Sequence, residues 1–170
     1  EAFCTVDLSG GDGFDPTHPT CLSEVERQGR LIGNGLVRVF QEKVRGLQDL
    51  FIAQLPARAG IRESRRLVAR HMLTGDELLN GTDFEDGIAR AAWPMEMREK
   101  PTGPKLRFAE GEMGQIPLRS LRPPGVDEFF VAGRCLGATH EAQAAIRVMG
   151  TCMATGEAAG KAAADTALHR

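Results

Sequence analysis

The chain has 170 residues with 21 basic and 23 acidic side chains, and 42% of its residues are hydrophobic, which is the balance of a globular protein rather than of a disordered tail. It has no basic excess, which argues against a nucleic-acid partner. No apolar run approaches the roughly 18 residues of a membrane-spanning helix, so a membrane is not expected as a partner either.

The first predicted element is a long amphipathic helix over about residues 24–45. Residues 1–21 are rich in Gly, Asp and Pro and predict a loop. Residues 23–26 then have the S-x-x-E form of a capping box, after which apolar residues recur at helical spacing. Gly46 is expected to stop this helix, and residues 47–55 predict a short second helical piece.

The middle of the chain predicts short elements separated by loops. For residues 60–73 the pattern fits a helix and a strand equally well. The sequence T-G-D-E at residues 74–77 is a second capping box, which opens a short helix that Asn-Gly at residues 80–81 ends. Apolar and charged residues alternate at residues 95–98, as in a half-buried strand, and residues 100–114 predict a loop.

The last third of the chain changes character. Residues 129–132 form a continuous apolar run, which is typical of a strand buried on both faces and ends at Gly133. The alanine-rich sequence from Thr139 onward predicts two helices with an interruption at Gly150-Thr151. Small residues at positions 156, 160 and 164 share one helical face, which suits tight packing against a sheet.

The blocks at residues 129–142 and 147–160 closely resemble the carboxyl-terminal end of FAD-dependent oxidoreductases of the glutathione-reductase-like fold. Three upstream blocks follow in the order of that family, at residues 60–73, 74–86 and 116–121. The resemblance implies the C-terminal part of an α/β, Rossmann-like FAD/NAD(P)-binding flavoprotein, whereas the isolated segment is expected to be α+β. Residues 1–123 would belong to a substrate-side domain, and residues 124–170 would be the final strand and helix of the FAD-binding domain.

In that family a buried strand ends beside the flavin, and the next helix points its amino terminus at the isoalloxazine ring. A helix amino terminus carries roughly half a positive charge and N–H groups without intrahelical acceptors, so it stabilises the negative charge of a reduced flavin. The resemblance therefore implies FAD as the cofactor. The implied cofactor-binding residues share this strand end and helix start: Gly133, Arg134, Met149, Gly150, Thr151, Cys152 and Met153.

Two residues are candidates for catalysis. His140 is expected either to donate or accept a proton beside the ring, or to cap the short helix. Arg147 is expected to anchor an anionic substrate or the flavin itself. The predicted reaction is the transfer of hydride or electrons between a small organic substrate and flavin. Cys135 and Cys152 flank the same place, either as a redox pair or as small buried side chains.

The motif G-x-G-x-x-G, which normally opens the dinucleotide site of this fold, does not occur in the 170 residues. The chain is therefore expected to be a carboxyl-terminal portion whose partner is a missing amino-terminal half, and to bind FAD weakly or not at all alone. Folded alone, it is expected to expose an apolar face through which it self-associates. The alternatives are a non-catalytic binding or assembly module folded without a cofactor, and a thiol enzyme that uses Cys135 with His140.

The four cysteines, Cys4, Cys21, Cys135 and Cys152, lie far apart without C-x-x-C spacing, so neither a zinc site nor an iron–sulfur cluster is expected. Scattered thiols in a chain of this size suit a reducing compartment, which predicts the cytoplasm. The sequence begins at Glu1 without methionine and without the pattern of a signal peptide, so the natural start is expected to be missing.

Overall fold

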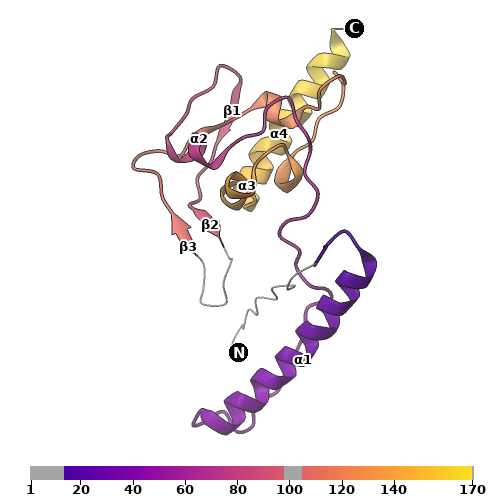
Figure 1. Ribbon diagram of the computed structural model, residues 1–170, viewed down its shortest axis with the longest axis vertical. Helices are drawn as coiled ribbons and strands as arrows, with labels where there is room; N and C mark the ends of the chain where they lie inside the picture. The colour runs from indigo at the N-terminus through magenta and orange to yellow at the C-terminus, as the bar shows by residue number, and fades with distance from the viewer. Residues whose placement is uncertain (1–13, 98–104, 170) are drawn as a thin grey trace. The chain divides into compact units, whose positions relative to one another are not determined.

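The computed structural model describes residues 14–97 and 105–169, and the chain divides into two compact units, Glu1–Ser64 and Arg65–Arg170 (Figure 1). The boundary expected between residues 123 and 124 separates parts of a complete flavoprotein by role and stays a prediction. The elements are, in chain order, α1 (Pro19–Lys43), α2 (Gly75–Leu79), β1 (Gly87–Arg90), β2 (Met95–Met97), β3 (Lys105–Arg107), β4 (Gln115–Pro117), the 3₁₀ helices η1 (Leu118–Leu121) and η2 (Gly133–Cys135), α3 (His140–Ile146) and α4 (Met149–Leu168).

The long helix of the first unit, α1, begins earlier than the sequence predicts. Pro19 stands in its first turn and His18 is its N-cap, so the predicted start at residue 24 is wrong and Ser23 lies inside the helix. The first turn suits proline because the N–H that proline lacks has no acceptor there. The carboxylate of Glu26, expected in a capping box, instead pairs with Arg30 at 2.7 Å.

The second helical piece predicted at residues 47–55 is also wrong. This segment is irregular and runs back along α1. The Gln41 amide donates to the Leu50 carbonyl at 2.8 Å, and a Cβ placed on Gly33 would lie 3.6 Å from Leu55 Cδ2. The apolar residues of this segment thus contact α1 and do not form a helix of their own.

The second capping box and its helix are confirmed. The Thr74 hydroxyl accepts from the Glu77 N–H at 3.3 Å, and the Glu77 carboxylate accepts from the Thr74 N–H at 2.8 Å. Gly81, with φ of +67°, takes the left-handed conformation that glycine tolerates after a helix. The capping box at the start and the glycine at the end lie within a few residues of each other, so the local sequence suffices to form this helix.

The strands form two antiparallel pairs. β1 pairs with β4 in the register Ala89 to Ile116, and β2 pairs with β3 in the register Met95 to Arg107. The predicted strand at residues 95–98 is confirmed for β2, whose two methionines are buried, while Arg98 lies outside the described residues. The predicted loop at 100–114 is wrong where β3 stands, and its first residues, like residues 1–13 of the N-terminal loop, lie outside the described part.

Residues 60–73, for which helix and strand competed, form neither. Residues 65–73 belong to the second unit. They run extended between two later segments of the second unit. The backbone N–H groups of Leu67, Arg70 and Leu73 donate to the carbonyls of Cys135, Arg122 and Gly137 at 2.8, 2.8 and 3.1 Å. Leu73 also forms a parallel bridge with Ala138. Long-range hydrogen bonds therefore hold this segment, and the local pattern could not reveal them.

The buried strand predicted at residues 129–132 is wrong. Its backbone is extended but belongs to no strand, and Phe129 is 52% exposed. Val131 donates to the Leu121 carbonyl at 2.8 Å, and the Arg122 guanidinium lies 5.2 Å from the centre of the Phe130 ring. A strand buried on both faces needs covering layers on each side, which the described residues do not supply here.

Two helices end the chain as predicted, but the interruption is at Arg147 and Val148 rather than at Gly150-Thr151. Thr151, Thr155 and Ala159 form the buried face of α4. The expected packing of the small-residue face is not found within residues 105–169, since a Cβ on Gly156 or Gly160 would meet nothing within 4 Å.

The helical part of the expected apolar face is exposed, whereas self-association through it stays a prediction. Met149 and Met153, which share the open side of α4 with the two glycines, are 81% and 73% exposed. The core of the second unit comes from fully buried side chains of most of its elements: Leu73, Leu78, Met95, Ile116, Leu121, Leu136 and Ile146. This mixture of helices with small antiparallel sheets agrees with the expected α+β class.

Within the described ranges, every helix is too short or too polar to cross a membrane. The cytoplasmic location stays a prediction.

Candidate functional site

The amino terminus of α4 lies beside η2, the short 3₁₀ helix at Gly133–Cys135. A Cβ placed on Gly133 would lie 3.7 Å from the Cys152 sulfur, and the Gly133 N–H donates to the Thr155 hydroxyl at 3.1 Å. Gly133 has φ of +73°, a conformation that glycine adopts without strain. Two of the regions that sequence analysis assigned to one site are therefore next to each other.

Thr155 is a residue of this junction that sequence analysis missed. Its side chain is fully buried, and its hydroxyl donates within α4 to the carbonyl of Thr151 at 3.0 Å or of Cys152 at 3.1 Å. The same oxygen accepts the Gly133 N–H, so it fixes η2 against the first turns of α4. The signal in the sequence is the four-residue spacing of Thr151 and Thr155, which places two hydroxyls on one helical face.

The tip of α4 has no side-chain cap, because its N-cap is Val148. The N–H groups of Met149, Gly150 and Thr151 have no acceptor within an α-helix, so the positive end of the helix dipole is located there. The Cys152 N–H already donates to the Val148 carbonyl at 2.9 Å and is not available as the predicted donor. The following N–H, that of Met153, belongs to the helical ladder for the same reason.

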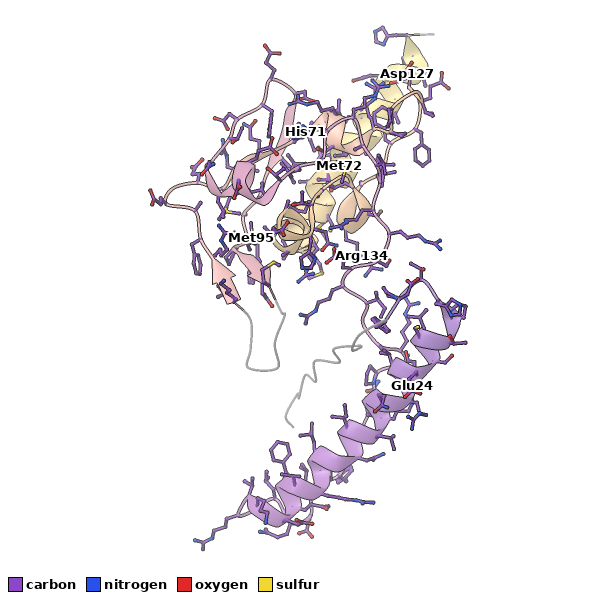
Figure 2. The ribbon with its side chains drawn as sticks, in the orientation of Figure 1. Glu24, His71, Met72, Met95, Asp127 and Arg134 are labelled. Atoms are coloured by element: carbon purple, nitrogen blue, oxygen red, sulfur yellow. The ribbon has the colours of Figure 1, made fainter. Side chains whose placement is uncertain are left out.

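The described residues leave the tip open. The side chain of Met149 is almost fully exposed, and a Cβ on Gly150 would meet nothing within 4 Å. Arg134, labelled in Figure 2, is exposed in the adjacent η2. N–H groups without an acceptor in the helix, a helix dipole and a neighbouring guanidinium form a donor set suited to an anionic or electron-rich ring edge.

Arg147, the predicted anchor, makes contacts with its own protein. Its guanidinium donates to the Glu96 carbonyl at 3.1 Å and to the Gln143 side-chain oxygen at 3.4 Å. The amide of Gln143, a buried residue that sequence analysis missed, donates in turn to the Arg134 carbonyl at 3.2 Å. These bonds connect β2 to η2, so Arg147 supports the position of the tip, and its anchoring of a substrate stays a prediction.

His140 is exposed at the start of α3. The cap of this helix is Thr139, whose hydroxyl accepts from the Ala142 N–H at 3.3 Å, so the alternative that His140 serves as the helix cap is wrong. An exposed imidazole beside η2 remains able to exchange protons with a bound molecule, and this role of His140 stays a prediction.

Comparison with known proteins now adds to the geometry. The model of a family described as FAD dependent oxidoreductase matches residues 5–169. The chain belongs to this family. Its cofactor is accordingly FAD. No curated protein and no solved structure matches the chain.

The two cysteines at the tip of this FAD dependent oxidoreductase differ in environment. Cys135 is exposed, and its thiol donates to the Ala132 carbonyl at 3.4 Å. Burial raises the pKa of the half-buried Cys152 thiol. A hydrogen bond from the Arg134 backbone N–H and the positive charge of Arg134 oppose this shift, and the neighbouring Cys135 adds to it. Cys21, Cys135 and Cys152 are all free thiols.

Sequence analysis missed a second polar cluster of the oxidoreductase, around His71 (Figure 2). Its Nε2 lies 3.1 Å from the Glu77 carboxylate, and its ring meets the edge of the Phe84 ring with 5.4 Å between centres. Burial raises the pKa of Glu77, but hydrogen bonds from the Thr74 N–H and hydroxyl and from His71 outweigh it, so the pKa is lowered overall. The capping box was readable from sequence, whereas His71 lies outside its spacing.

The lowered pKa of Glu77 gives a prediction about acid stability. A carboxyl group whose folded pKa lies below its unfolded value stabilises the fold above the unfolded value, near 4.5, and this stabilisation is lost as the pH falls through the folded pKa. We expect Glu77→Gln to lower the free energy of unfolding at pH 7 by about 1 kcal/mol. We also expect the free energy of unfolding of this variant to decrease less steeply as the pH falls below 5. Urea unfolding across this pH range measures both effects, with Glu42→Gln, at an exposed position of α1, as the control. An unchanged pH dependence of the free energy of unfolding below pH 5 in Glu77→Gln would contradict the assignment.

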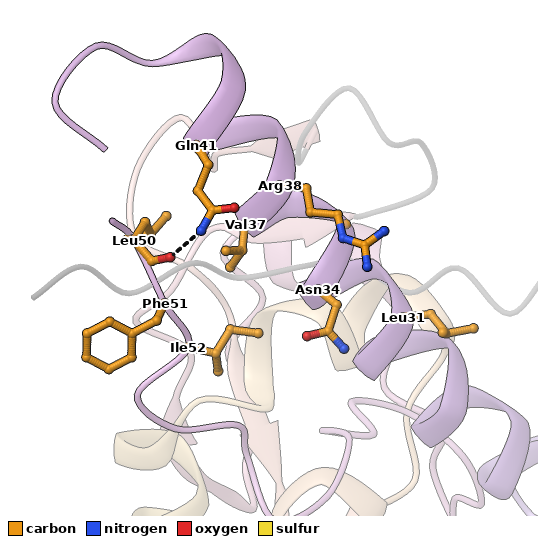
Figure 3. Close-up of a pocket in the computed structure, with 9 residues that line it drawn as sticks. Leu31, Asn34, Val37, Arg38, Gln41, Leu50, Phe51 and Ile52 are labelled. Atoms are coloured by element: carbon orange, nitrogen blue, oxygen red, sulfur yellow. Dashed lines mark hydrogen bonds between the residues drawn. The ribbon is translucent and has the colours of Figure 1, made fainter. Parts of the chain in front are cut away.

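The first unit of the oxidoreductase contains a hollow of about 630 Å³ between α1 and the returning chain (Figure 3). Its wall includes apolar side chains and the Gln41 amide bonded to the Leu50 carbonyl: Leu31, Asn34, Gly35, Val37, Arg38, Gln41, Leu50, Phe51 and Ile52. None of the predicted site residues is among them, and the hollow therefore adds nothing to the site at the tip of α4.

Proposed function

We propose that this chain supplies the flavin-ring side of an oxidoreductase that transfers hydride or electrons between a small organic substrate and FAD. The observation that carries the proposal is the open, uncapped amino terminus of α4 beside Gly133. The chemistry supplied by bound FAD is the reversible acceptance of two electrons. All other parts of the proposal concern what the residues of the chain do.

The N–H groups of Met149, Gly150 and Thr151 would stabilise negative charge at the ring edge. They belong to a helix of 20 residues, so the dipole behind them is fully developed. Their direction is fixed before any ligand binds, because Thr155 holds η2 against α4 and the bonds of Gln143 hold η2 from the other side. Donors fixed in advance favour the negatively charged form without a cost of reorganisation.

Two side chains would act on the substrate. His140, exposed next to η2, is positioned to give or take a proton, and Arg134 offers a guanidinium for an anionic group of the substrate or the cofactor. Arg147 would contribute through its bonds to Glu96 and Gln143, which hold the tip in place, and by anchoring an anionic group of the substrate or the cofactor. The substrate is a small organic molecule of unspecified class.

The proposal includes a partner polypeptide of glutathione-reductase-like, Rossmann-like fold that carries the G-x-G-x-x-G turn. The absence of this motif from the 170 residues supports it, as does the exposed side of α4 with its two methionines and two open glycines. The natural arrangement would be an amino-terminal half of the same protein docked on that side. Self-association through it is the competing arrangement.

Reconstitution with FAD tests the function. Expressed from its complete coding sequence, the protein is expected to be yellow, to release FAD on denaturation, and to have its flavin bleached anaerobically by a substrate from a panel of small organic reductants. The matched control is the 170-residue chain, which is expected to take up little FAD. A complete protein that is colourless and does not bind added FAD would favour the non-catalytic binding module instead.

A further inference from the structure

We propose that Cys135 and Cys152 form a dithiol–disulfide pair at the tip of α4, and that its substrate is a small-molecule disulfide. The pair needs no flavin, so the proposal stands or falls separately from the function proposed above. Its chemistry is thiol–disulfide exchange, which the described residues can carry out with the substrate alone.

The two sulfur atoms lie against two consecutive residues, that of Cys135 against Ala132 and that of Cys152 against Gly133. The Cys135 thiol donates to the carbonyl of Ala132 at 3.4 Å, and the Cys152 sulfur lies 3.7 Å from the place of a Cβ on Gly133. The Gly133–Thr155 hydrogen bond holds η2 and α4 together at this point. Because Cys135 is exposed, its side chain can change rotamer toward Cys152 without repacking a core.

The different environments of the two thiols assign them different roles. Cys135 is exposed, so a disulfide in solution reaches it first. Cys152 is half-buried, and its burial and raised pKa keep it as a thiol that reacts slowly with reagents from solution. Cys135 is therefore the attacking cysteine, and Cys152 is the resolving cysteine.

The exchange balances in two steps. The Cys135 thiolate attacks one sulfur of the substrate disulfide, which forms a mixed disulfide with Cys135 and releases one half of the substrate as a thiol. The Cys152 thiolate then attacks the Cys135 sulfur, which closes the protein disulfide and releases the other half as a second thiol. The protein loses two electrons and two protons, and the substrate disulfide gains both.

The test uses oxidised glutathione and the full chain with Cys4 and Cys21 replaced by serine, which leaves Cys135 and Cys152 as its thiols. We expect digestion without reductant to yield a peptide that links Cys135 to Cys152. In the same background, Cys152→Ser is expected to accumulate a stable glutathione adduct on Cys135. Cys135→Ser is expected to react about tenfold more slowly, since the remaining thiol is half-buried.

Cys21, a half-buried thiol on α1, provides the matched control. When it is the one remaining cysteine, it is expected to end as a glutathione adduct. The proposal is overturned if the chain with both tip cysteines also ends as two separate adducts, or if Cys135 and Cys152 are modified at equal rates. Should a serine variant fail to fold, the iodoacetamide rates of the two thiols in the folded parent decide, with Cys135 expected to be about tenfold faster.

Discussion

Replacement of Met149 by glutamate is expected to weaken FAD binding by the complete oxidoreductase by about 10- to 100-fold. A carboxylate in the first turn of α4 would occupy the positive end of the helix and repel the electron-rich edge of the ring, at a cost of about 1.4–2.8 kcal/mol. The repulsion grows when the ring is reduced, so the midpoint potential of the bound flavin is expected to become more negative. Fluorescence titration and spectroelectrochemistry measure the two effects.

The matched control is Leu168→Glu, which adds the same charge at an exposed site in the last turn of α4. Along a helix of 20 residues the two sites are about 28 Å apart, so this variant should bind FAD normally. The Met149 variant should also melt no lower than the parent, because a negative charge near a helix amino terminus is favourable. Equal FAD affinities of parent and Met149→Glu would refute the assignment of the α4 tip to the flavin.

Gly137→Ala is expected to lower the free energy of unfolding of the second unit by about 3 kcal/mol. A Cβ there would lie 2.2 Å from Ala69 Cβ and 3.2 Å from the carbonyl oxygens of His71 and Ser120. Three backbone segments cross at this point, so none can move without breaking the hydrogen bonds that hold residues 65–73 in place. Urea unfolding followed by circular dichroism measures the loss.

The control for this prediction makes the same substitution on the open side of α4. Gly156→Ala meets nothing within 4 Å and is expected to raise the free energy of unfolding by about 0.5–1 kcal/mol, because alanine is the better helix former. Ala69→Gly combined with Gly137→Ala should recover part of the loss, since it removes the closest contact. A Gly137→Ala chain as stable as the parent would show that the crossing is looser than described.

The accuracy of the sequence predictions depended on how far apart the interacting residues lie. The capping box of Thr74 and Glu77 and the alternation of Met95 and Met97 were correct, because neighbouring residues decide these elements. The capping box expected at residues 23–26 failed because a proline upstream offered an earlier start. The apolar run at residues 129–132 failed because its pattern cannot state whether covering layers are present.

In the candidate site, too, the contacts between residues distant in sequence were the hardest to predict. The family resemblance correctly placed Gly133 near Cys152. Neither a helical nor a strand periodicity connects these two positions of the sequence. Thr155 and Gln143 were missed because their importance comes from single hydrogen bonds to η2, and no periodicity marks a buried amide or hydroxyl as the partner of a distant carbonyl or N–H. Their geometry had to be observed.

The extended segment at residues 65–73 has a consequence for biosynthesis. Its hydrogen-bond acceptors, at Arg122, Cys135 and Gly137, are synthesised 50 to 70 positions later along the chain, as the bonds from Arg70 and Leu67 show. Closing such long loops delays folding until the later residues are available. The second unit is therefore expected to collapse in one late event after Thr139 has left the ribosome, and nascent chains that stall earlier should be open to proteases across residues 65–73.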